Sequence, residues 1–207
     1  MRTLVVAPHP DDEALGCGGT LLRRKAEGAE LGWLIVTDIS EQHGWPQERV
    51  LQRQVEIADV AEAIGFGRVY NLRQPAAKLD DVPMHDLIEK ISAVVKEFQP
   101  EEVLVPHYSD AHSDHRVVFH ATAACTKWFR NPSIRRVLAY ETISETDFGL
   151  AADQAFRPNF YVDISNFLHR KLEVMRIYKS ELGVFPFPRS IEAIQARGVE
   201  GRAPEAQ

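Results

Sequence analysis

The sequence predicts an α/β fold, a Rossmann-like three-layer sandwich in which helices cover both faces of a mostly parallel sheet. Short apolar, β-branched runs alternate along the chain with longer segments of helical periodicity, and this alternation is typical of right-handed βαβ units. The 207 residues fit one domain with a single core, residues 1–207. Ligands of such sheets bind beyond the carboxyl ends of the strands, so the active site is expected at that edge.

Six strands are expected, because six apolar or β-branched runs end in polar or turn residues: 3–8, 31–37, 67–72, 102–107, 136–141 and 160–164. Three helices are expected between them, at 18–28, 47–64 and 83–98. The first ends at Gly28, the second at Gly65 and the third before Pro100, and glycine and proline are typical of helix ends. The tail 198–207 is expected to be loosely held.

Composition and charge exclude several classes of protein. The chain has 24 Lys and Arg against 30 Asp and Glu, with no basic stripe that could follow a phosphate backbone, so nucleic acid is not an expected partner. Cys17 and Cys125 lie far apart and indicate neither a disulfide framework nor a thiolate zinc site. No apolar stretch reaches a membrane-spanning length, and the first is too short for a signal peptide. A cytoplasmic protein without a transmembrane segment is expected, with a homo-oligomer left open.

Two polar clusters follow strands of the predicted sheet. His9, Asp11, Asp12 and Glu13 come directly after the first strand, although a turn needs none of these side chains to close. The cluster HYSDAHSDH, residues 107–115, follows the fourth strand. Because both strands end at the carboxyl edge of the sheet, the two clusters are expected to share one site.

The first cluster and the end of the second contain a metal-ligand set. His9, Asp12 and His115 offer two imidazoles and one carboxylate, which is usual for a catalytic divalent metal with a coordination position open to water. Such a metal lowers the pKa of its bound water from about 15.7 toward about 7. Adjacent turn residues cannot both point at the metal, so Asp11 is free to face this water as a general base.

His112 lies three residues before His115, and Asp114 lies between them. A histidine held by the Asp114 carboxylate and kept protonated would stabilise a developing oxyanion or protonate a leaving amine. The sequence therefore predicts catalytic roles for His112 and Asp114.

Two parts of the first cluster and of the segment after it allow other interpretations. Glu13 either takes part in the chemistry or simply places negative charge at the N-terminus of the following helix. Gly16, Gly18 and Gly19 suggest a dinucleotide site, but GCGGTL is not GxGxxG and the preceding acids would repel a pyrophosphate. The glycines are instead expected to let the helix pack closely on the sheet.

The two motifs APHPDDEALGCGG and DAHSDH, in this order, resemble the paired motifs of the PIG-L/LmbE deacetylases. Segments 53–66 and 171–182 also resemble helices of that family. The resemblance implies a zinc-dependent enzyme that removes the acetyl group from N-acetylglucosamine-type amino sugars. Iron(II) is an alternative metal, because affinity alone does not decide which metal occupies such a site. The resemblance implies that His9, Asp12 and His115 are the zinc ligands and that Asp11 is the base. It also implies that His112 stabilises the tetrahedral intermediate and that Asp114 orients His112.

The same resemblance suggests substrate contacts. Arg53 matches a position that contacts substrate in relatives, with a solvated helix arginine as the alternative. Asp110 stands where some members place a tyrosine that helps polarise the amide, and it is counted among the substrate-binding residues. His43 and Trp45 either line a sugar pocket or lie on a surface loop. The segment 183–194 either forms a wall of the cleft or fastens the C-terminal segment to the core.

The expected reaction is hydrolysis of an N-acetyl group on an N-acetylglucosamine-type sugar or its conjugate. An amidase acting on thiol-containing pseudodisaccharides or thiol conjugates is the alternative within the family. A non-haem iron oxygenase would share the ligand set, but Asp11 and the α/β pattern argue against it. An inactive sugar- or metal-binding module is disfavoured because all the matched positions are filled.

Overall fold

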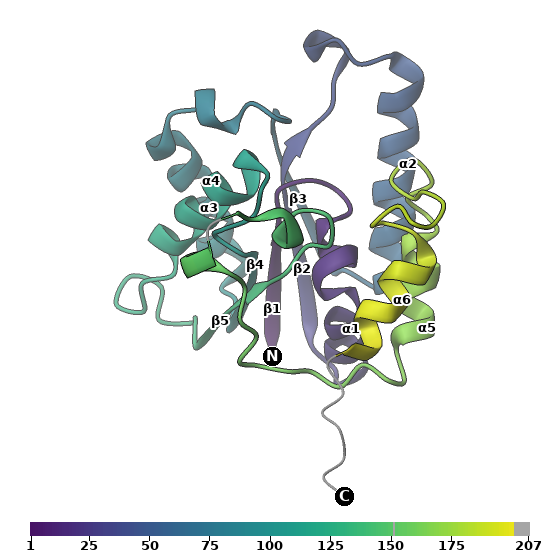
Figure 1. Ribbon diagram of the computed structural model, residues 1–207. Coiled ribbons are helices and arrows are strands. Elements are labelled where there is room, and N and C mark those ends of the chain that lie inside the picture. The colour runs from purple at the N-terminus through teal and green to yellow at the C-terminus, as the bar shows by residue number, and fades with distance from the viewer. Residues whose placement is uncertain (151, 201–207) are drawn as a thin grey trace, which may run out of the picture.

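The structure is a computed structural model that describes residues 1–150 and 152–200. Helices cover both faces of a central sheet (Figure 1). In the described part of the chain the sheet has five parallel strands in the order β3-β2-β1-β4-β5. The strands are β1 (Arg2–Ala7), β2 (Glu30–Asp38), β3 (Arg68–Pro75), β4 (Glu102–Pro106) and β5 (Arg136–Tyr140). The predicted α/β class is therefore confirmed.

Six α-helices and four short 3-10 helices lie within the described residues. The α-helices are α1 (Asp12–Ala26), α2 (Gln47–Ile64), α3 (Met84–Phe98), α4 (Ser113–Cys125), α5 (Leu168–Met175) and α6 (Ile191–Glu200). The 3-10 helices are η1 (Glu41–His43), η2 (Leu79–Asp81), η3 (Thr146–Phe148) and η4 (Ala152–Gln154). Within residues 1–150 and 152–200, no helix is both long enough and apolar enough to span a membrane.

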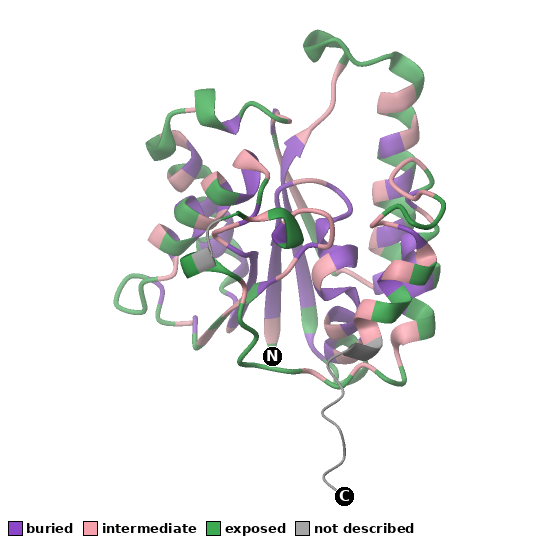
Figure 2. Ribbon diagram, in the orientation of Figure 1, coloured by how far each residue is buried: buried purple, intermediate pink, exposed green. Residues whose placement is uncertain are grey.

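The central strand β1 contributes to two hydrophobic cores, because alternate residues of a strand face opposite sides of the sheet. Val5 and Ala7 belong to the core under α1, α2, α5 and α6. Leu4 and Val6 belong to the core under α3 and α4. The burial of this layer is visible in Figure 2. The core is therefore built on both faces of β1, and the end of this strand is firmly held.

The strand order reverses at β1, which pairs with β2 on one side and with β4 on the other. After β1 the chain enters α1 on one face of the sheet, and after β4 it enters α4 on the opposite face. The two connections separate at this point, which corresponds to the ligand-binding switch point of other α/β sheets. The fold thus brings the two polar clusters of the sequence to one place.

The expected strand at 160–164 is wrong. This segment belongs to no strand, and Phe160 and Tyr161 are exposed. The guanidinium of Arg23 in α1 donates a hydrogen bond to the Asp163 carbonyl at 2.8 Å. The side chain of Ile164 lies so close to Gly19 that a Cβ there would come within 2.6 Å of its Cδ1. The apolar pattern of the segment therefore reflects packing on helix α1 and not strand pairing.

Three helical expectations need correction. The first helix begins at Asp12, not at residue 18, so the HPDDE motif runs into its first turn. Residues 113–115 form the first turn of α4 and are not part of a loop. Gly198, expected in the loose tail, lies in α6, where a Cβ would come within 2.6 Å of Leu168 Cδ1. Residues 201–207 of that tail lie outside the described residues.

Candidate active site

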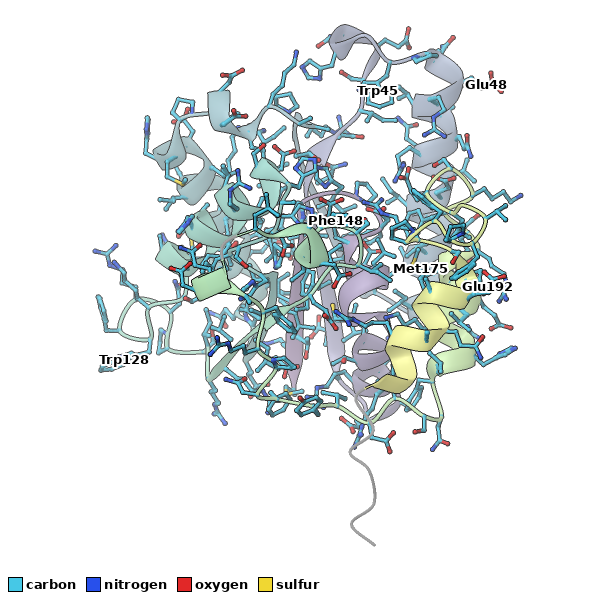
Figure 3. The ribbon with its side chains drawn as sticks, viewed as in Figure 1. Trp45, Glu48, Trp128, Phe148, Met175 and Glu192 are labelled. Atoms are coloured by element: carbon cyan, nitrogen blue, oxygen red, sulfur yellow. The ribbon has the colours of Figure 1, made fainter. Side chains whose placement is uncertain are left out.

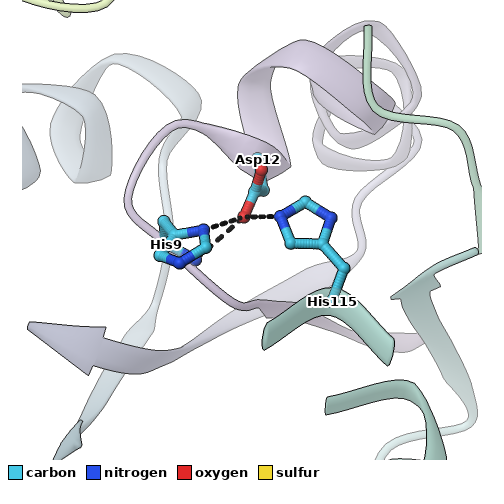
Figure 4. A group of neighbouring side chains, drawn as sticks. All are labelled: His9, Asp12 and His115. Atoms are coloured by element: carbon cyan, nitrogen blue, oxygen red, sulfur yellow. Dashed lines mark hydrogen bonds and ion pairs between the residues drawn. The ribbon is translucent and has the colours of Figure 1, made fainter. Parts of the chain in front are cut away.

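Three side chains from the two clusters converge beside the end of β1. His9 lies on the turn after β1, Asp12 begins α1 and His115 lies in the first turn of α4. The Oδ2 atom of Asp12 is 3.3 Å from His9 Nδ1 and 3.3 Å from His115 Nε2. Figure 4 shows both imidazoles turned toward this oxygen. The predicted ligand set is thus assembled from residues that are far apart in the sequence.

The spacing of these donor atoms suits a metal ion. Ligands at about 2.0–2.1 Å from a tetrahedral zinc ion are roughly 3.3–3.4 Å from each other, close to the two measured separations. All three donor atoms lie within 4.8 Å of one another. Two imidazoles and one carboxylate also leave a coordination position for a water molecule or substrate. The residues present therefore fit a divalent metal, whether zinc or iron(II).

The carboxylates around these side chains favour a cation at the same place. Burial alone would lower the pKa of His115, but the Asp12 and Asp110 carboxylates outweigh it and raise the pKa to about 10. Burial also opposes protonation of His9, whose hydrogen bonds with Asp114 and Asp12 nevertheless raise its pKa to about 9. A bound metal would replace the protons that these carboxylates otherwise hold on the histidines.

Each of the two predicted histidine ligands has its other ring nitrogen within hydrogen-bond distance of a buried carboxylate. His9 Nε2 is 2.9 Å from Asp114 Oδ2, and His115 Nδ1 is 2.8 Å from Asp110 Oδ2. Such pairs fix the orientation and tautomer of a metal-binding imidazole and increase its basicity. The structure therefore gives Asp114 and Asp110 the same role toward two different histidines.

This arrangement corrects the predicted role of Asp114. Its carboxylate orients His9, not His112, and accepts the backbone N–H groups of Ala77 at 2.7 Å and Leu79 at 3.1 Å. Only the backbone N–H of Asp114 bonds to His112, at its Nδ1 atom and 3.1 Å. The carboxylate is thus fixed by the segment that follows β3.

Asp110 also differs from the expectation. It is fully buried, its Oδ1 accepts a hydrogen bond from the Thr146 hydroxyl at 2.7 Å, and its Oδ2 faces His115. Neither oxygen is directed to a substrate. Asp110 is therefore a buried hydrogen-bond partner of the predicted metal ligand His115, and both of its oxygens are engaged within the protein.

Asp110→Asn is expected to weaken metal binding by about 10- to 100-fold, because the carboxylate that makes His115 a better ligand loses its charge. A competition titration with a chromophoric chelator measures this affinity. Asp80→Asn, an exposed acid of η2, removes the same charge away from His115 and is expected to leave the affinity unchanged. Equal affinity in Asp110→Asn and Asp80→Asn would contradict the role of Asp110.

Asp11 is buried next to the ligand Asp12. Its backbone has φ 136°, a conformation that non-glycine residues rarely adopt. Burial raises the pKa of the Asp11 carboxyl to about 7, the neighbouring Asp12 adds to the shift, and Arg189 opposes it. A carboxylate that titrates near neutral pH is well suited to accept a proton from water.

Glu13 is fully buried and does not act as a solvent-exposed helix cap. Its Oε2 accepts the backbone N–H of Asp11 at 3.1 Å, and its Oε1 accepts the Tyr178 hydroxyl at 2.7 Å. Burial raises its pKa to about 8. Glu13 thus stabilises the unusual backbone conformation of Asp11 from a fully buried position.

His112 caps the N-terminus of α4 and lies against both ligand histidines, with ring centroids 4.6 Å from His9 and 5.3 Å from His115. Because its Nδ1 accepts the Asp114 N–H, the neutral ring carries its proton on Nε2. Burial and the neighbouring histidines His9 and His115 lower the pKa of His112. The structure favours a neutral hydrogen-bond donor here, in place of the protonated histidine expected from the sequence.

Three of the predicted substrate contacts, Arg53, His43 and Trp45, differ in their surroundings. Arg53 is buried on α2 and donates to the Pro10 carbonyl at 2.5 Å and to the Glu181 carboxylate. His43 and Trp45 are exposed, and Figure 3 shows Trp45 on the outer loop before α2. Arg53 therefore holds the HPDD turn, and substrate contacts for all three residues stay predictions.

Sequence reasoning missed Arg189, which reaches the site from the segment 183–194. Its Nη1 donates to Asp11 Oδ2 at 2.9 Å, whereas Phe185 and Phe187 of the same segment are exposed. The available signal is that Arg189 is the single charged residue between Glu181 and Glu192. A lone arginine among apolar residues is typical of a buried ion pair, but its partner cannot be identified from the sequence.

The sequence of this chain matches known proteins. Residues 4–126 match the model of the PIG-L family, whose description is GlcNAc-PI de-N-acetylase. The diacetylchitobiose deacetylase of Thermococcus kodakarensis is 27% identical over 192 residues, which cover 87% of this chain and 70% of that protein.

Solved structures share the fold. The conserved protein TT1542 of Thermus thermophilus superposes with a TM-score of 0.73 and 29% identity, over 94% of this chain and 84% of that one. GalB, the 4-carboxy-2-hydroxymuconate hydratase of Pseudomonas putida, has a TM-score of 0.68 and 18% identity, over 100% of this chain and 92% of that one. Since a hydratase shares this fold, the fold alone does not determine the reaction.

Proposed function

The chain belongs to the PIG-L family, and on this premise we propose that it is a metal-dependent N-deacetylase of an N-acetylglucosamine-type amino sugar or its conjugate. The observation that carries the proposal is the set of His9, Asp12 and His115 at metal-ligand spacing, with the acid Asp11 buried next to Asp12. A metal site with an adjacent carboxylate is typical of hydrolysis by an activated water molecule.

The metal itself is part of the proposal. His9 Nδ1, Asp12 Oδ2 and His115 Nε2 would hold it, and we favour zinc, with iron(II) as the alternative. Bound there, a divalent ion supplies Lewis acidity for the acetyl carbonyl and lowers the pKa of a water molecule. Asp110 and Asp114 keep the two imidazoles oriented for this task.

The remaining steps belong to side chains of this chain. Asp11 takes a proton from water as the new C–O bond forms at the acetyl carbon. His112 donates its Nε2–H to the carbonyl oxygen while negative charge develops there. As the C–N bond breaks, the amine nitrogen takes the proton that Asp11 accepted from water, and the products are acetate and a free amino sugar.

Two further parts of the proposal concern the compartment and the substrate. Cys17 and Cys125 are free and buried, which supports a reducing compartment such as the cytoplasm. The thiol-conjugate amidase alternative needs the same metal and the same base, because the bond cleaved is again an amide. The two classes of substrate differ in the groups that this amide joins, so substrate panels separate them.

Acetate release from N-acetylglucosamine, diacetylchitobiose and N-acetylglucosaminides tests the proposed function. The metal-loaded protein is expected to release one acetate per free amine formed. Chelation is expected to abolish the release and added zinc to restore it. Failure to cleave any sugar amide by protein with stoichiometric metal would overturn the amino-sugar assignment, and cleavage of thiol-conjugate amides in its place would establish the alternative.

A further inference from the structure

Arg189 contacts three parts of the molecule, one of which is the turn that carries the predicted base Asp11. It lies between α5 and α6, in a segment that follows the exposed Phe185 and Phe187. Its guanidinium contacts Asp11 on the turn after β1, Glu181 after α5, and the segment between β5 and η3. No other basic side chain within residues 1–150 and 152–200 has an ion pair with Asp11.

The position of the guanidinium is fixed without Asp11. Nε of Arg189 donates to the Ser144 hydroxyl at 2.7 Å, and Nη2 donates to Glu145 Oε1 at 3.0 Å. Nη1 lies 3.5 Å from Glu181 Oε2 and 2.9 Å from Asp11 Oδ2. The planar fork of an arginine held at two of its nitrogens can present the third in only one direction.

The hydrogen bonds that hold the backbone of Asp11 do not hold its side chain. Its N–H donates to Glu13 Oε2, and its carbonyl accepts Ala14 N–H at 3.0 Å and Leu15 N–H at 2.9 Å. These bonds hold the unusual φ of 136°. They leave rotation about the side-chain bonds free, and the bond from Arg189 to Oδ2 restricts that rotation.

We propose that Arg189 is a positioning residue for Asp11: by binding Oδ2, it fixes the carboxylate so that Oδ1 is the oxygen that takes the proton from water. The inference rests on the proposed function, because Asp11 needs a reaction in which to act as base. Glu181 extends the arrangement, since it also binds Arg53, the residue that holds the Pro10 carbonyl. Two arginines that share one glutamate thus hold consecutive residues of the turn.

The chain offers a matched control in Arg197. Arg197 of α6 also links the C-terminal part of the chain to the segment after β5, through Glu141 at 2.7 Å and Asp147 at 2.8 Å. Among the described contacts, it makes no ion pair with Asp11. Arg197→Ala therefore removes a comparable link without removing the contact with the base.

Arg189→Ala is expected to lower kcat for acetate release by about 100-fold, the loss typical of a misplaced reacting group. Its KM and its metal content are expected to stay close to those of the wild type. Guanidinium chloride at a few millimolar is expected to restore part of the lost kcat, and Arg189→Lys to restore less, because an ammonium lacks the planar fork. Arg197→Ala is expected to keep the wild-type kcat.

A readout independent of turnover accompanies the kinetics. A crystal structure of Arg189→Ala is expected to show the Asp11 carboxylate rotated or in two rotamers, with its backbone still bonded to Glu13. An unmoved carboxylate, an unchanged kcat, or equal losses of kcat and Tm in Arg189→Ala and Arg197→Ala without rescue by guanidinium would overturn the inference. Wild-type protein that releases no acetate would instead overturn the proposed function, and the role of Arg189 with it.

Discussion

Asp11→Asn is expected to lower kcat for acetate release by about 10²- to 10⁴-fold, the usual contribution of a general base, without loss of the metal. Asparagine keeps the shape of the side chain and tolerates the positive φ of this position better than most residues, so the fold should be retained. It cannot accept a proton from water near neutral pH. Steady-state kinetics together with metal analysis of the same sample measure the two quantities.

The role of Asp11 as a base also predicts the direction in which kcat/KM changes with pH. A base must be deprotonated to act, so wild-type kcat/KM should rise with pH through the pKa of Asp11, which burial and Asp12 raise to about 7. The residual activity of Asp11→Asn should lack this rise. The exposed acid Asp80 is the control, because Asp80→Asn should keep both the rate and the acidic limb. A variant at Asp11 with full kcat would exclude it as the base.

Two kinds of feature could be predicted from the sequence: the ends of strands, which depend on neighbouring residues, and the edge of the sheet that parallel strands share. The apolar run of β1 and the polar residues that follow it determine where a strand ends and what stands at its end. His9 and Asp12 lie on that turn, and His115 lies after another parallel strand of the sheet. The shared carboxyl edge of β1 and β4 was therefore enough to place all three together.

The partners of the ligand histidines could not be predicted, because proximity in the sequence does not show where a side chain points. Asp114 is two residues from His112, yet the first turn of α4 directs its carboxylate to His9, 105 residues away. Asp110 lies five residues before His115 and bonds to it. The same limit applies to Arg189, which meets Asp11 across 178 residues.

The wrong prediction of a strand at 160–164 has a similar physical reason. The residues of 160–164 are apolar at alternate positions, which is the pattern of a half-buried strand. That pattern reports that one side of an extended segment is buried, and not what covers it. Here the covering element is helix α1 at Gly19.

His115→Gln is expected to reduce acetate release to background and to weaken metal binding severely, because one of the three protein ligands is lost. Asp110 and Asp12 both face His115 from buried positions, and removing the partner of a buried charge costs about 3–5 kcal/mol. Glutamine keeps a hydrogen-bond donor near these carboxylates, so it is preferred to alanine. Circular dichroism and Tm show whether the variant is folded.

The variants Asp11→Asn and His115→Gln distinguish the role of a base from that of a metal ligand. Asp11→Asn should hold metal without turning over substrate, whereas folded His115→Gln should fail to retain metal during dialysis, and added zinc should restore activity poorly. His120→Gln serves as the control, since His120 lies on the exposed side of the same helix α4 and should bind metal as the wild type does. If folded His115→Gln held stoichiometric metal tightly, the metal would have to be bound by other side chains. Asp11 would then no longer be placed beside a metal-bound water molecule, and its assignment as the base would lose its support.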